Sequence, residues 1–494
     1  MEKENNLGFI GLLKSFTKPF WLASVMELFE RWAWYGLFAV LALYLTGSTD
    51  EGALGFTHIE RGEIMSYVTF ILYLLPIITG AISDKIGYKV SLIIAYLLLG
   101  VGYYFMGEVT SYGAVFAMFL VVAVGAAMFK PVASAIVTKS TDKRNSSFGF
   151  GVFYMMVNIG GFFGPLFSAK LRDEYGWRIV FIMATVAIAV NLIIVIFFFK
   201  EPDREKSTDS LGETVSKSLK NIWEALSDMR LTLLLVIMVG FWVMFNQLFY
   251  TLPVFIEEWV DTHQVYELFH SILPPIAEFL KNKEGAINPE MIVNLDAFFI
   301  IIFQMGISMI ILKWKPISAM MTGIIIAMIG IAISFYTNNS LYTVLGILIF
   351  AIGEMTSNPK FSDYIAKISP KGKEALYMGT YFLPIAVANL LTKWITGDLY
   401  EKYSDKVALI RRELTSRNIE LPAIEGGYSK NDFYAEAAQK LEMSQKQMTE
   451  FMWNTYHPSN IWYVIAGIGV LTIVGLLIYN SVLSRKDKVA ISGK

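Results

Sequence analysis

The chain has 494 residues, of which 55% are hydrophobic and 17% charged, with a net charge of −1 and a mean hydropathy of +0.51. A soluble domain usually has about 25% charged residues, so this chain has too little polar surface to cover itself in water. The near-zero net charge gives no reason to expect nucleic acid as a partner. Because the chain has no cysteine, disulfides, thiolate metal sites and cysteine nucleophiles are excluded.

Long apolar stretches recur along the chain, each near the ~20 residues that a helix needs to cross about 30 Å of hydrocarbon. Backbone groups in lipid need internal hydrogen bonds, so these stretches predict helices rather than open strands. The N-terminal segment lacks the apolar core and cleavage site of a signal peptide, and we expect the first span to stay attached. The twelve predicted spans are 20–47, 61–83, 88–108, 112–138, 147–171, 177–199, 230–259, 293–313, 316–336, 341–367, 375–399 and 459–483.

Basic residues are concentrated in alternate short loops, whereas the loops between them are acidic or neutral. The positive-inside rule places the basic loops and both termini in the cytoplasm, and an even number of spans requires the same. We therefore expect a multi-pass protein of the inner or plasma membrane. The basic residues are Lys14, Lys18, Lys85, Lys89, Lys139, Lys143, Arg144, Lys313, Lys315, Lys371, Lys373, Arg485, Lys486 and Lys488.

A polar stretch at 200–229 separates the spans into two sets of six. The prediction is an N-terminal six-helix bundle over 1–199, a cytoplasmic linker with an amphipathic helix, and a C-terminal six-helix bundle over 230–494. Two long outward segments, 260–292 and 400–458, interrupt the second bundle. The later one has the charge-rich periodicity of a short helical hairpin. It is either a solvated insertion or a lid over the substrate entrance.

Three ionisable residues lie deep in the first span, where each costs at least ~2.5–3.5 kcal/mol on insertion scales and usually lines a pathway. Glu27, Glu30 and Arg31 are spaced i, i+3 and i+4, which places them on one face of a helix. A neutralising ion pair would explain one acid but not two. The cluster therefore indicates a functional role.

Two further charges stand alone in later spans. Lys130 precedes a proline; it could extend to the cytoplasmic surface, but it lies nine residues before Lys139 in the basic loop, which favours the bundle interior. Glu354 lies beside a helix-breaking Asn-Pro pair, as expected for a midplane site between structural repeats. If Lys130 and Glu354 paired, protonation of the acid or binding of a charged solute would separate them, which is a physical basis for proton coupling.

Other polar residues in the spans are weaker candidates, because each is more often an interhelical hydrogen bond than a ligand contact. An enzyme is not expected, since the four histidines lie at loops or span ends and neither a His-Glu-x-x-His nor a Walker sequence occurs. We expect no metal and no cofactor. The weaker polar candidates are Tyr35, Tyr73, Tyr154, Asn158, Trp242, Asn246, Gln247, Asn294, Gln304 and Tyr381.

Several of these segments resemble a known family. The loop over 80–89 resembles the loop 2–3 signature of the major facilitator superfamily, and Glu27-x-x-Glu30-Arg31 resembles the ExxER motif of its proton-dependent oligopeptide transporters. In the loop, the gate residues would be Gly80, Asp84, Lys85 and Gly87. Further similar segments in chain order are FKP at 129–131, FYMMVNIGGFFGP at 153–165, FW at 241–242, NLDAFFI at 294–300, GEMTSNP at 353–359 and GTYFLPIAVANLL at 379–391.

The resemblance implies an all-α major facilitator fold of about twelve transmembrane helices in two six-helix halves. It implies a monomeric symporter that imports small peptides or peptide-like solutes by alternating access, with protons as the coupling ion. Arg31 and Lys130 would face the peptide carboxylate, Glu27 and Glu30 would carry protons, and a Lys130–Glu354 pair would help close the cytoplasmic side. The implied amino-end residues are Asn158, Asn294 and Glu354; the implied lining residues are Tyr35, Tyr73, Trp242 and Tyr381, with Tyr154 and Asn246 as further candidates.

The chain departs from the family at two positions that normally form a salt bridge near the external side. It has Phe38 in place of an arginine and Asn246 in place of an acid. Losing both leaves no unpaired buried charge, so we expect a different external gate that involves the long insertions. The departure also leaves open another organic anion, amino acid or metabolite as the solute, and a non-transporting membrane receptor or scaffold as the role.

Overall fold

A computed structural model describes residues 9–142, 145–201, 210–370, 373–425 and 427–492. Within these ranges the regular structure is helical, and β-structure is limited to two isolated bridges, Asp261 with Asn339 and Lys281 with Ile287. The expected loop residues Lys143, Arg144 and Lys371 lie outside the described ranges.

The chain divides into two compact units. The first comprises 1–38, 74–168 and 178–220, and the second comprises 39–73, 169–177 and 221–494. The helices that lie wholly or mostly in the first unit are α1 (Phe9–Ser15), α2 (Lys18–Thr46), α4 (Pro76–Ile86), α5 (Tyr88–Met106), α6 (Tyr112–Lys139), α7 (Ser146–Tyr175), α8 (Arg178–Ile193), η2 (Ile194–Phe198) and α9 (Leu211–Leu226).

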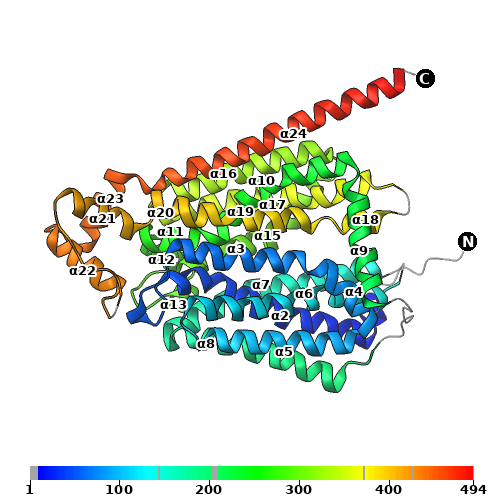
Figure 1. Ribbon diagram of the computed structural model, residues 1–494, viewed down its shortest axis with the longest axis horizontal. Coiled ribbons are helices and arrows are strands. Elements are labelled where there is room, and N and C mark those ends of the chain that lie inside the picture. Colours follow the sequence, from blue (N-terminus) through cyan, green and yellow to red (C-terminus); the bar gives the residue numbers. More distant parts are fainter. Residues whose placement is uncertain (1–8, 143–144, 202–209, 371–372, 426, 493–494) are drawn as a thin grey trace, which may run out of the picture. The chain divides into compact units, whose positions relative to one another are not determined.

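The second unit also holds α3 and the elements from α10 onward (Figure 1). Its long helices are α3 (His58–Leu74), α10 (Met229–Tyr250), α15 (Leu295–Ile311), α16 (Pro316–Tyr336), α17 (Ser340–Ile368) and α24 (Ile461–Ser492). Its shorter elements are α11 (Leu252–Trp259), α12 (His263–Ile272), α13 (Pro274–Leu280), α14 (Pro289–Val293), α18 (Glu374–Met378), α19 (Phe382–Lys393), η3 (Trp394–Leu399), α20 (Tyr400–Tyr403), α21 (Lys406–Ser416), α22 (Lys430–Lys440) and α23 (Gln445–Tyr456).

The predicted spans correspond to helices. Among the described residues, nine helices are long and apolar enough to cross a membrane, and α3 with α4 forms a tenth candidate that bends by 46°. The predicted span over 20–47 is α2, whose hydropathy is lowered by its charged residues. The span over 375–399 is an interrupted run through α18, α19 and the π-helix η3. The linker contains the expected amphipathic helix as α9.

The segment over 400–458, which the sequence predicts to face outward, is helical as expected, but it is not a two-helix hairpin. It contains α21, α22 and α23, which Figure 1 shows in orange beyond one end of the long helices of the second unit. Ser429 and Ser444 begin α22 and α23 with capping boxes, in which the serine hydroxyl and the N3 side chain satisfy backbone N–H groups reciprocally. These caps define two separate helix starts after α21, so the segment has one helix more than the predicted hairpin.

Glycines position the charged part of α2. A Cβ at Gly160 of α7 would lie 2.6 Å from the Leu28 carbonyl oxygen and 2.8 Å from the Arg31 Cβ, and one at Gly164 would lie 2.6 Å from the Trp32 carbonyl oxygen. The two glycines are four residues apart and so share one face of α7. Their missing side chains let α7 approach α2 at the level of Arg31.

A second close helix pair positions Glu354. A Cβ at Gly353 of α17 would lie 2.3 Å from the Ala327 nitrogen of α16, and one at Gly330 of α16 would lie 2.3 Å from the Phe350 nitrogen. Small residues of this kind let membrane helices pack backbone to backbone. The contact directs the Gly353 side of α17 toward α16, and Glu354 follows on the adjoining face.

Candidate functional site

The charged residues of α2 form one buried cluster in the first unit. The Nε of Arg31 lies 3.3 Å from the Glu27 Oε1 and donates to the Glu30 Oε2 at 2.5 Å. All three residues are buried. The i, i+3, i+4 spacing thus brings the predicted residues together, with one guanidinium serving two carboxylates.

Lys130 and Tyr35 belong to the same cluster. Lys130 interacts electrostatically with Glu27, Glu30 and Arg31, so it faces the bundle rather than the cytoplasmic surface. The Arg31 guanidinium lies over the Tyr35 ring at 5.6 Å. Two acids and two bases therefore share one buried region, in which moving a proton changes which groups pair.

The predicted residues of α7 take different positions. Tyr154 is 56% exposed, and Asn158 is half-buried one turn farther along the same helix. Within the first unit, the structure does not place Tyr154 in the Arg31 cluster.

The predicted gate loop joins α4 to α5. Gly87 has φ +106°, a conformation that favours glycine, and the Tyr88 hydroxyl donates to Asp84 at 3.1 Å. Glu201 was not predicted; its carboxylate accepts from the backbone N–H groups of Tyr88 and Lys89 at 2.8 and 2.7 Å. An acid there caps the positive N-terminus of α5 and fixes the loop. Gly80 and Lys85 are half-buried in the preceding helix, α4.

In the second unit, Glu354 has a neighbour that sequence reasoning missed. Asp296 of α15 is 3% exposed, and it interacts electrostatically with Glu354 of α17. Asp296 Oδ1 and Glu354 Oε2 are buried without a hydrogen-bond partner among the described residues. The structure therefore sets a second buried acid electrostatically against the one that the sequence indicated.

The remaining predicted residues of the second unit lie on α3 and α10 and directly before α15 and α19. Tyr381 donates to Asn358 at 2.6 Å, and the Tyr73 ring lies 6.3 Å from that of Phe382. Asn246, the departure from the family pattern, donates to Asn389 at 3.1 Å. The remaining placements are Trp242, buried with its Nε1 lacking a partner among the described residues, and Asn294, half-buried at the start of α15.

A charged network joins the insertion over 400–458 to the N-terminal end of α3. Lys430 of α22 lies 2.9 Å from the Glu258 Oε1 of α11, and Tyr400 donates to the Glu258 Oε2 at 2.9 Å. The His58 Nε2 is 3.5 Å from both Glu258 and Asp405. The charge of Lys430 compensates the buried Glu258. These groups hold α3, α11, α20 and α22 together.

The next turn of α3 strengthens this contact. Arg61 is fully buried; it donates to the Thr396 hydroxyl of η3 at 2.9 Å and also to the Thr396 carbonyl. Its guanidinium lies 5.2 Å from the Tyr400 ring centre. A Cβ at Gly62 would lie 3.2 Å from the Gly397 nitrogen, so α3 and η3 touch backbone to backbone. The π-helical turn of η3 directs the Thr396 carbonyl to Arg61.

His58, Glu258 and Asp405 have ligand atoms within 4.8 Å of one another, a spacing that a metal ion tolerates. However, Glu258 is already paired with the Lys430 ammonium group. A cation in this position competes with a metal for the same carboxylate, so the cluster fits an ion-pair network better.

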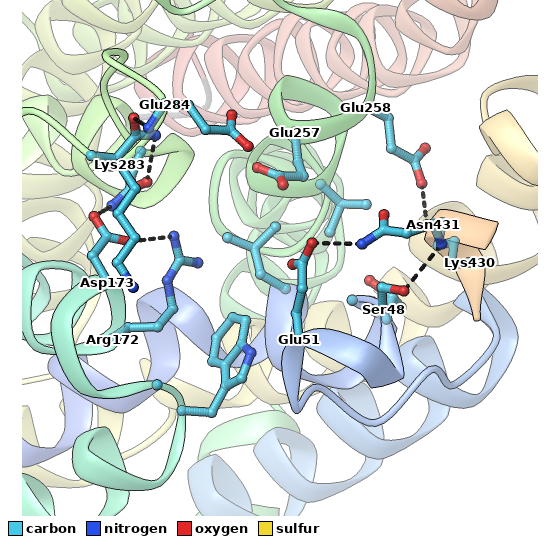
Figure 2. A pocket seen from close by; sticks show the side chains of 18 of the residues that line it. Ser48, Glu51, Arg172, Asp173, Glu257, Glu258, Lys283, Glu284, Lys430 and Asn431 are labelled. Atoms are coloured by element: carbon cyan, nitrogen blue, oxygen red, sulfur yellow. Dashed lines mark hydrogen bonds and ion pairs between the residues drawn. The ribbon is translucent and has the colours of Figure 1, made fainter. Parts of the chain in front are cut away.

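A pocket of about 450 Å³ adjoins the network in the second unit (Figure 2). Glu51 and Glu257 point into it from opposite walls, and Glu51 accepts a hydrogen bond from Asn431 at 2.7 Å. Arg172 forms part of another wall and is paired with Glu290 at 3.2 Å. Residues from both insertions line the pocket, which shows that 260–292 and 400–458 converge on one region.

The comparisons with known proteins agree with this fold. A family model described as Major Facilitator Superfamily matches residues 21–392. The chain belongs to this superfamily: it is an all-α, multi-pass membrane protein with a transporter fold, and the matching proteins are transporters rather than enzymes.

Solved structures share the fold over nearly the whole chain. A POT family transporter in complex with 5-aminolevulinic acid has a TM-score of 0.67 and 18% identity, covering 97% of this chain and 98% of its own. A peptide transporter POT in complex with sulfate has a TM-score of 0.61 and 18% identity, covering 97% and 96%. The nucleoside transporter NupG has a TM-score of 0.64 and 12% identity, covering 94% and 100%. At these identities the likeness shows the fold alone.

Curated relatives match over a shorter region. Dipeptide and tripeptide permease A of Edwardsiella piscicida is 29% identical over 187 residues, 37% of each chain. The same permease of Escherichia coli (strain K12) is 28% identical over 187 residues, 37% of this chain and 36% of the permease. An uncharacterized transporter of Bacillus subtilis (strain 168), YclF, is 30% identical over 189 residues, 37% and 36%. Each match spans little more than a third of the relative's length.

Proposed function

We propose that the protein is a proton-coupled symporter that imports small peptides, such as di- and tripeptides, or peptide-like solutes by alternating access. The observation that carries the proposal is the buried cluster of Glu27, Glu30, Arg31 and Lys130, in which two acids and two bases share one region. Such a cluster can hold a proton in one arrangement and a solute carboxylate in another. The curated dipeptide and tripeptide permeases support the choice of solute.

The two predicted six-helix bundles would move against each other. The protein would act as a monomer in the plasma membrane, with both termini in the cytoplasm. Arg31 and Lys130 would bind the solute carboxylate, and Glu354 would hold its amino end. The residues proposed to line the solute path are Tyr35, Tyr73, Tyr154, Asn158, Trp242, Asn246, Asn294 and Tyr381. No cofactor is needed beyond the proton.

The external gate would be the network around Glu258. Phe38, in place of an arginine, stacks on Trp34 with ring centres 5.2 Å apart, and Asn246 bonds to α19, so neither supplies the missing salt bridge. Lys430 provides a buried charge pair with Glu258 at this end of α3 instead, and the His58 ring lies 3.5 Å from the same carboxylate. In this proposal the insertion at 400–458 closes the gate, while Gly80, Asp84, Lys85 and Gly87 shape the cytoplasmic one.

A second candidate keeps the fold and changes the solute to an organic anion, an amino acid or another metabolite. It is favoured by the complex of a POT family transporter with 5-aminolevulinic acid and by the absence of an arginine at Phe38. A thermal-shift screen separates the candidates, because a ligand that binds only the folded state raises apparent stability. A di- or tripeptide that stabilises the protein supports the first, and stabilisation only by other metabolites supports the second.

The test of the main proposal is uptake of a labelled dipeptide into vesicles that contain the purified protein. An inward proton gradient should accelerate uptake, and Glu27→Gln, Glu30→Gln or Lys130→Ala should abolish the acceleration. An uptake rate that is the same with and without the proton gradient contradicts proton coupling. A non-transporting receptor or scaffold role is supported instead by two results together. Substitutions at Glu27 and Glu354 leave the protein's function in the cell unchanged, and deletion of 400–458 abolishes that function.

A further inference from the structure

The pocket of about 450 Å³ in the second unit contains none of the residues proposed for the solute path. Its volume lies within the range of about 300–1,000 Å³ that is usual for small-molecule sites. Residues of the α2–α3 connection, of α11 and of both insertions line it. Segments far apart in the sequence therefore build one cavity of the size that a small solute needs.

Two of the cations that line the pocket are already compensated. Arg172 lies 3.2 Å from the Glu290 carboxylate, and Lys430 lies 2.9 Å from that of Glu258. These pairs join neighbouring elements of the second unit. They leave the charges of other lining residues to be accounted for.

Two acids of the pocket have no ion pair within the described part of the chain. Glu51 and Glu257 point into the pocket from opposite walls (Figure 2). The Glu51 carboxylate accepts a hydrogen bond from the neutral Asn431 amide at 2.7 Å, and no hydrogen bond joins Glu257 to the described residues. A cation favours the ionised form of neighbouring carboxylates, so the space that these two acids share suits an ammonium group.

An uncompensated cation lies in the insertion over 400–458. Lys406 is half-buried and donates to the Glu258 backbone carbonyl at 3.1 Å. The rings of Trp259 and Tyr434 lie 5.6 and 5.2 Å from its Nζ and hold it in place. An ammonium group has three N–H donors, so the bond to one carbonyl leaves donors for a carboxylate. Lys283 also lines the pocket but is exposed, where water weakens its attraction for an anion.

We propose that this pocket is a second binding site for the solute, with the solute's ammonium group between Glu51 and Glu257 and its carboxylate on Lys406. A zwitterion fits because the pocket supplies uncompensated charge of both signs, whereas a simple anion or cation would leave one sign unmatched. The proposal rests on the proposed function, since it takes the same class of solute. It deepens that function by giving the two insertions a role in holding the solute at residues separate from the Arg31 cluster.

Occupancy of the pocket is measured at a thiol in its wall. The protein has no cysteine, so Lys283→Cys gives a single thiol, across the pocket from Lys430 (Figure 2). Alanyl-alanine should slow the labelling of this thiol by a maleimide. Lys440→Cys, at an exposed residue of α22 outside the lining, is the matched control and should label at one rate with and without dipeptide. Dipeptide that slows neither thiol, or both equally, overturns the proposal.

The two charged ends of the solute are tested with blocked dipeptides. N-acetyl-alanyl-alanine lacks the ammonium group, and alanyl-alanine amide lacks the carboxylate. Each should need a concentration about tenfold or more higher for the same protection, since hydrogen bonds to charged groups are the strong ones. These probes leave the protein unchanged, so the result does not depend on the stability of a pocket variant. Equal protection by all three compounds contradicts a zwitterion site, and protection by Ca²⁺ alone identifies a metal site in its place.

Substitutions in the Lys283→Cys protein assign each end to its residue. Glu257→Gln should weaken protection by alanyl-alanine about tenfold or more and leave protection by the N-acetyl form unchanged. Lys406→Met should weaken protection by alanyl-alanine and leave protection by the amide unchanged. Glu267→Gln, at an exposed residue of α12 outside the lining, is the control. If Glu257→Gln behaves like Glu267→Gln, Glu257 does not bind the ammonium group and the proposal is wrong.

Failure of this proposal is distinguishable from failure of the proposed function. If a proton gradient drives dipeptide uptake but dipeptide never protects the pocket thiol, the second site is wrong and the symporter stands. If dipeptide protects the thiol but uptake is the same with and without the gradient, the second site stands and the proton coupling is wrong.

Discussion

The guanidinium of Arg31 lies 3.3 Å from the Glu27 carboxylate while it also bonds to Glu30. One cation between two buried acids leaves one acid incompletely neutralised, and Lys130 is close enough to compensate it. The arrangement is therefore poised between alternative pairings. A solute carboxylate or a proton changes the balance, which is the property that a coupled transporter requires.

Replacing Glu27 should separate transport from coupling. In Glu27→Gln, Arg31 pairs one-to-one with Glu30, so the cluster no longer exchanges a proton. We expect gradient-driven uptake to fall at least about tenfold, equivalent to a rise of about 1.4 kcal/mol or more in the barrier to coupled uptake, while exchange of solute across the membrane continues. Vesicle uptake with and without a proton gradient measures both.

The matched control is Glu108→Gln, which removes an acid paired with Arg178 outside this cluster. It should keep gradient-driven uptake. If Glu108→Gln and Glu27→Gln lose coupling to the same extent, the loss does not report on the Arg31 cluster.

The close approach of α7 to α2 predicts a large difference between two glycines of one helix. Gly160→Ala should lower stability by about 1–3 kcal/mol, because the new Cβ meets backbone and side-chain atoms of α2. Gly151→Ala meets nothing within 4 Å and should be neutral or slightly stabilising. Thermal unfolding in detergent compares the two, and equal melting temperatures would contradict the packing.

Breaking the Glu258–Lys430 pair should open the outer end of α3. Removing one partner of a buried ion pair costs about 3–5 kcal/mol, because the remaining charge is unpaired. The protein has no cysteine, so Ser66→Cys, at a buried position of α3, gives a single thiol reporter. Lys430→Met should increase labelling of this thiol by an impermeant reagent added outside.

The double variant Glu258→Gln/Lys430→Met removes both charges and should restore part of the protection. Labelling that is the same in all three backgrounds would show that the network does not control external access.

Lys406 offers a local test of the insertion's electrostatics. Burial and the neighbouring Lys430 lower the pKa of Lys406 to about 8, against the opposing effect of Glu258. A lowered pKa in the folded state means that the protonated amine is disfavoured by folding, so stability should rise as pH increases from about 8 toward 10.5. Competitive amine labelling followed by mass spectrometry should give a midpoint near pH 8. A midpoint above pH 10 would contradict the buried position.

The charged face of α2 could be predicted, because helical spacing alone sets which side chains share a face. The spans were predictable for the same kind of reason, since length and apolarity fix them. Linker helix α9 followed from its amphipathic pattern. These features depend on residues near one another in the sequence.

The partners of isolated charges could not be predicted. Asp296 stands close to a polar outward segment, so its position in the sequence resembled that of a residue at a span end, and its proximity to Glu354 depends on how α15 packs on α17. Likewise, the pairing of Glu258 with Lys430 joins positions 172 residues apart. The π-helical turn of η3, which directs the Thr396 carbonyl to Arg61, has no local sequence signature.

The most direct test of coupling measures the proton movement that an inward gradient of dipeptide drives. Vesicles containing the protein and an internal pH-sensitive dye are placed at equal pH on both sides, with the membrane potential clamped, and a dipeptide is added outside. A symporter should carry protons inward with the dipeptide and acidify the lumen, and Glu27→Gln should not. A lumen whose pH stays constant while labelled dipeptide accumulates to equilibrium would contradict proton-coupled transport.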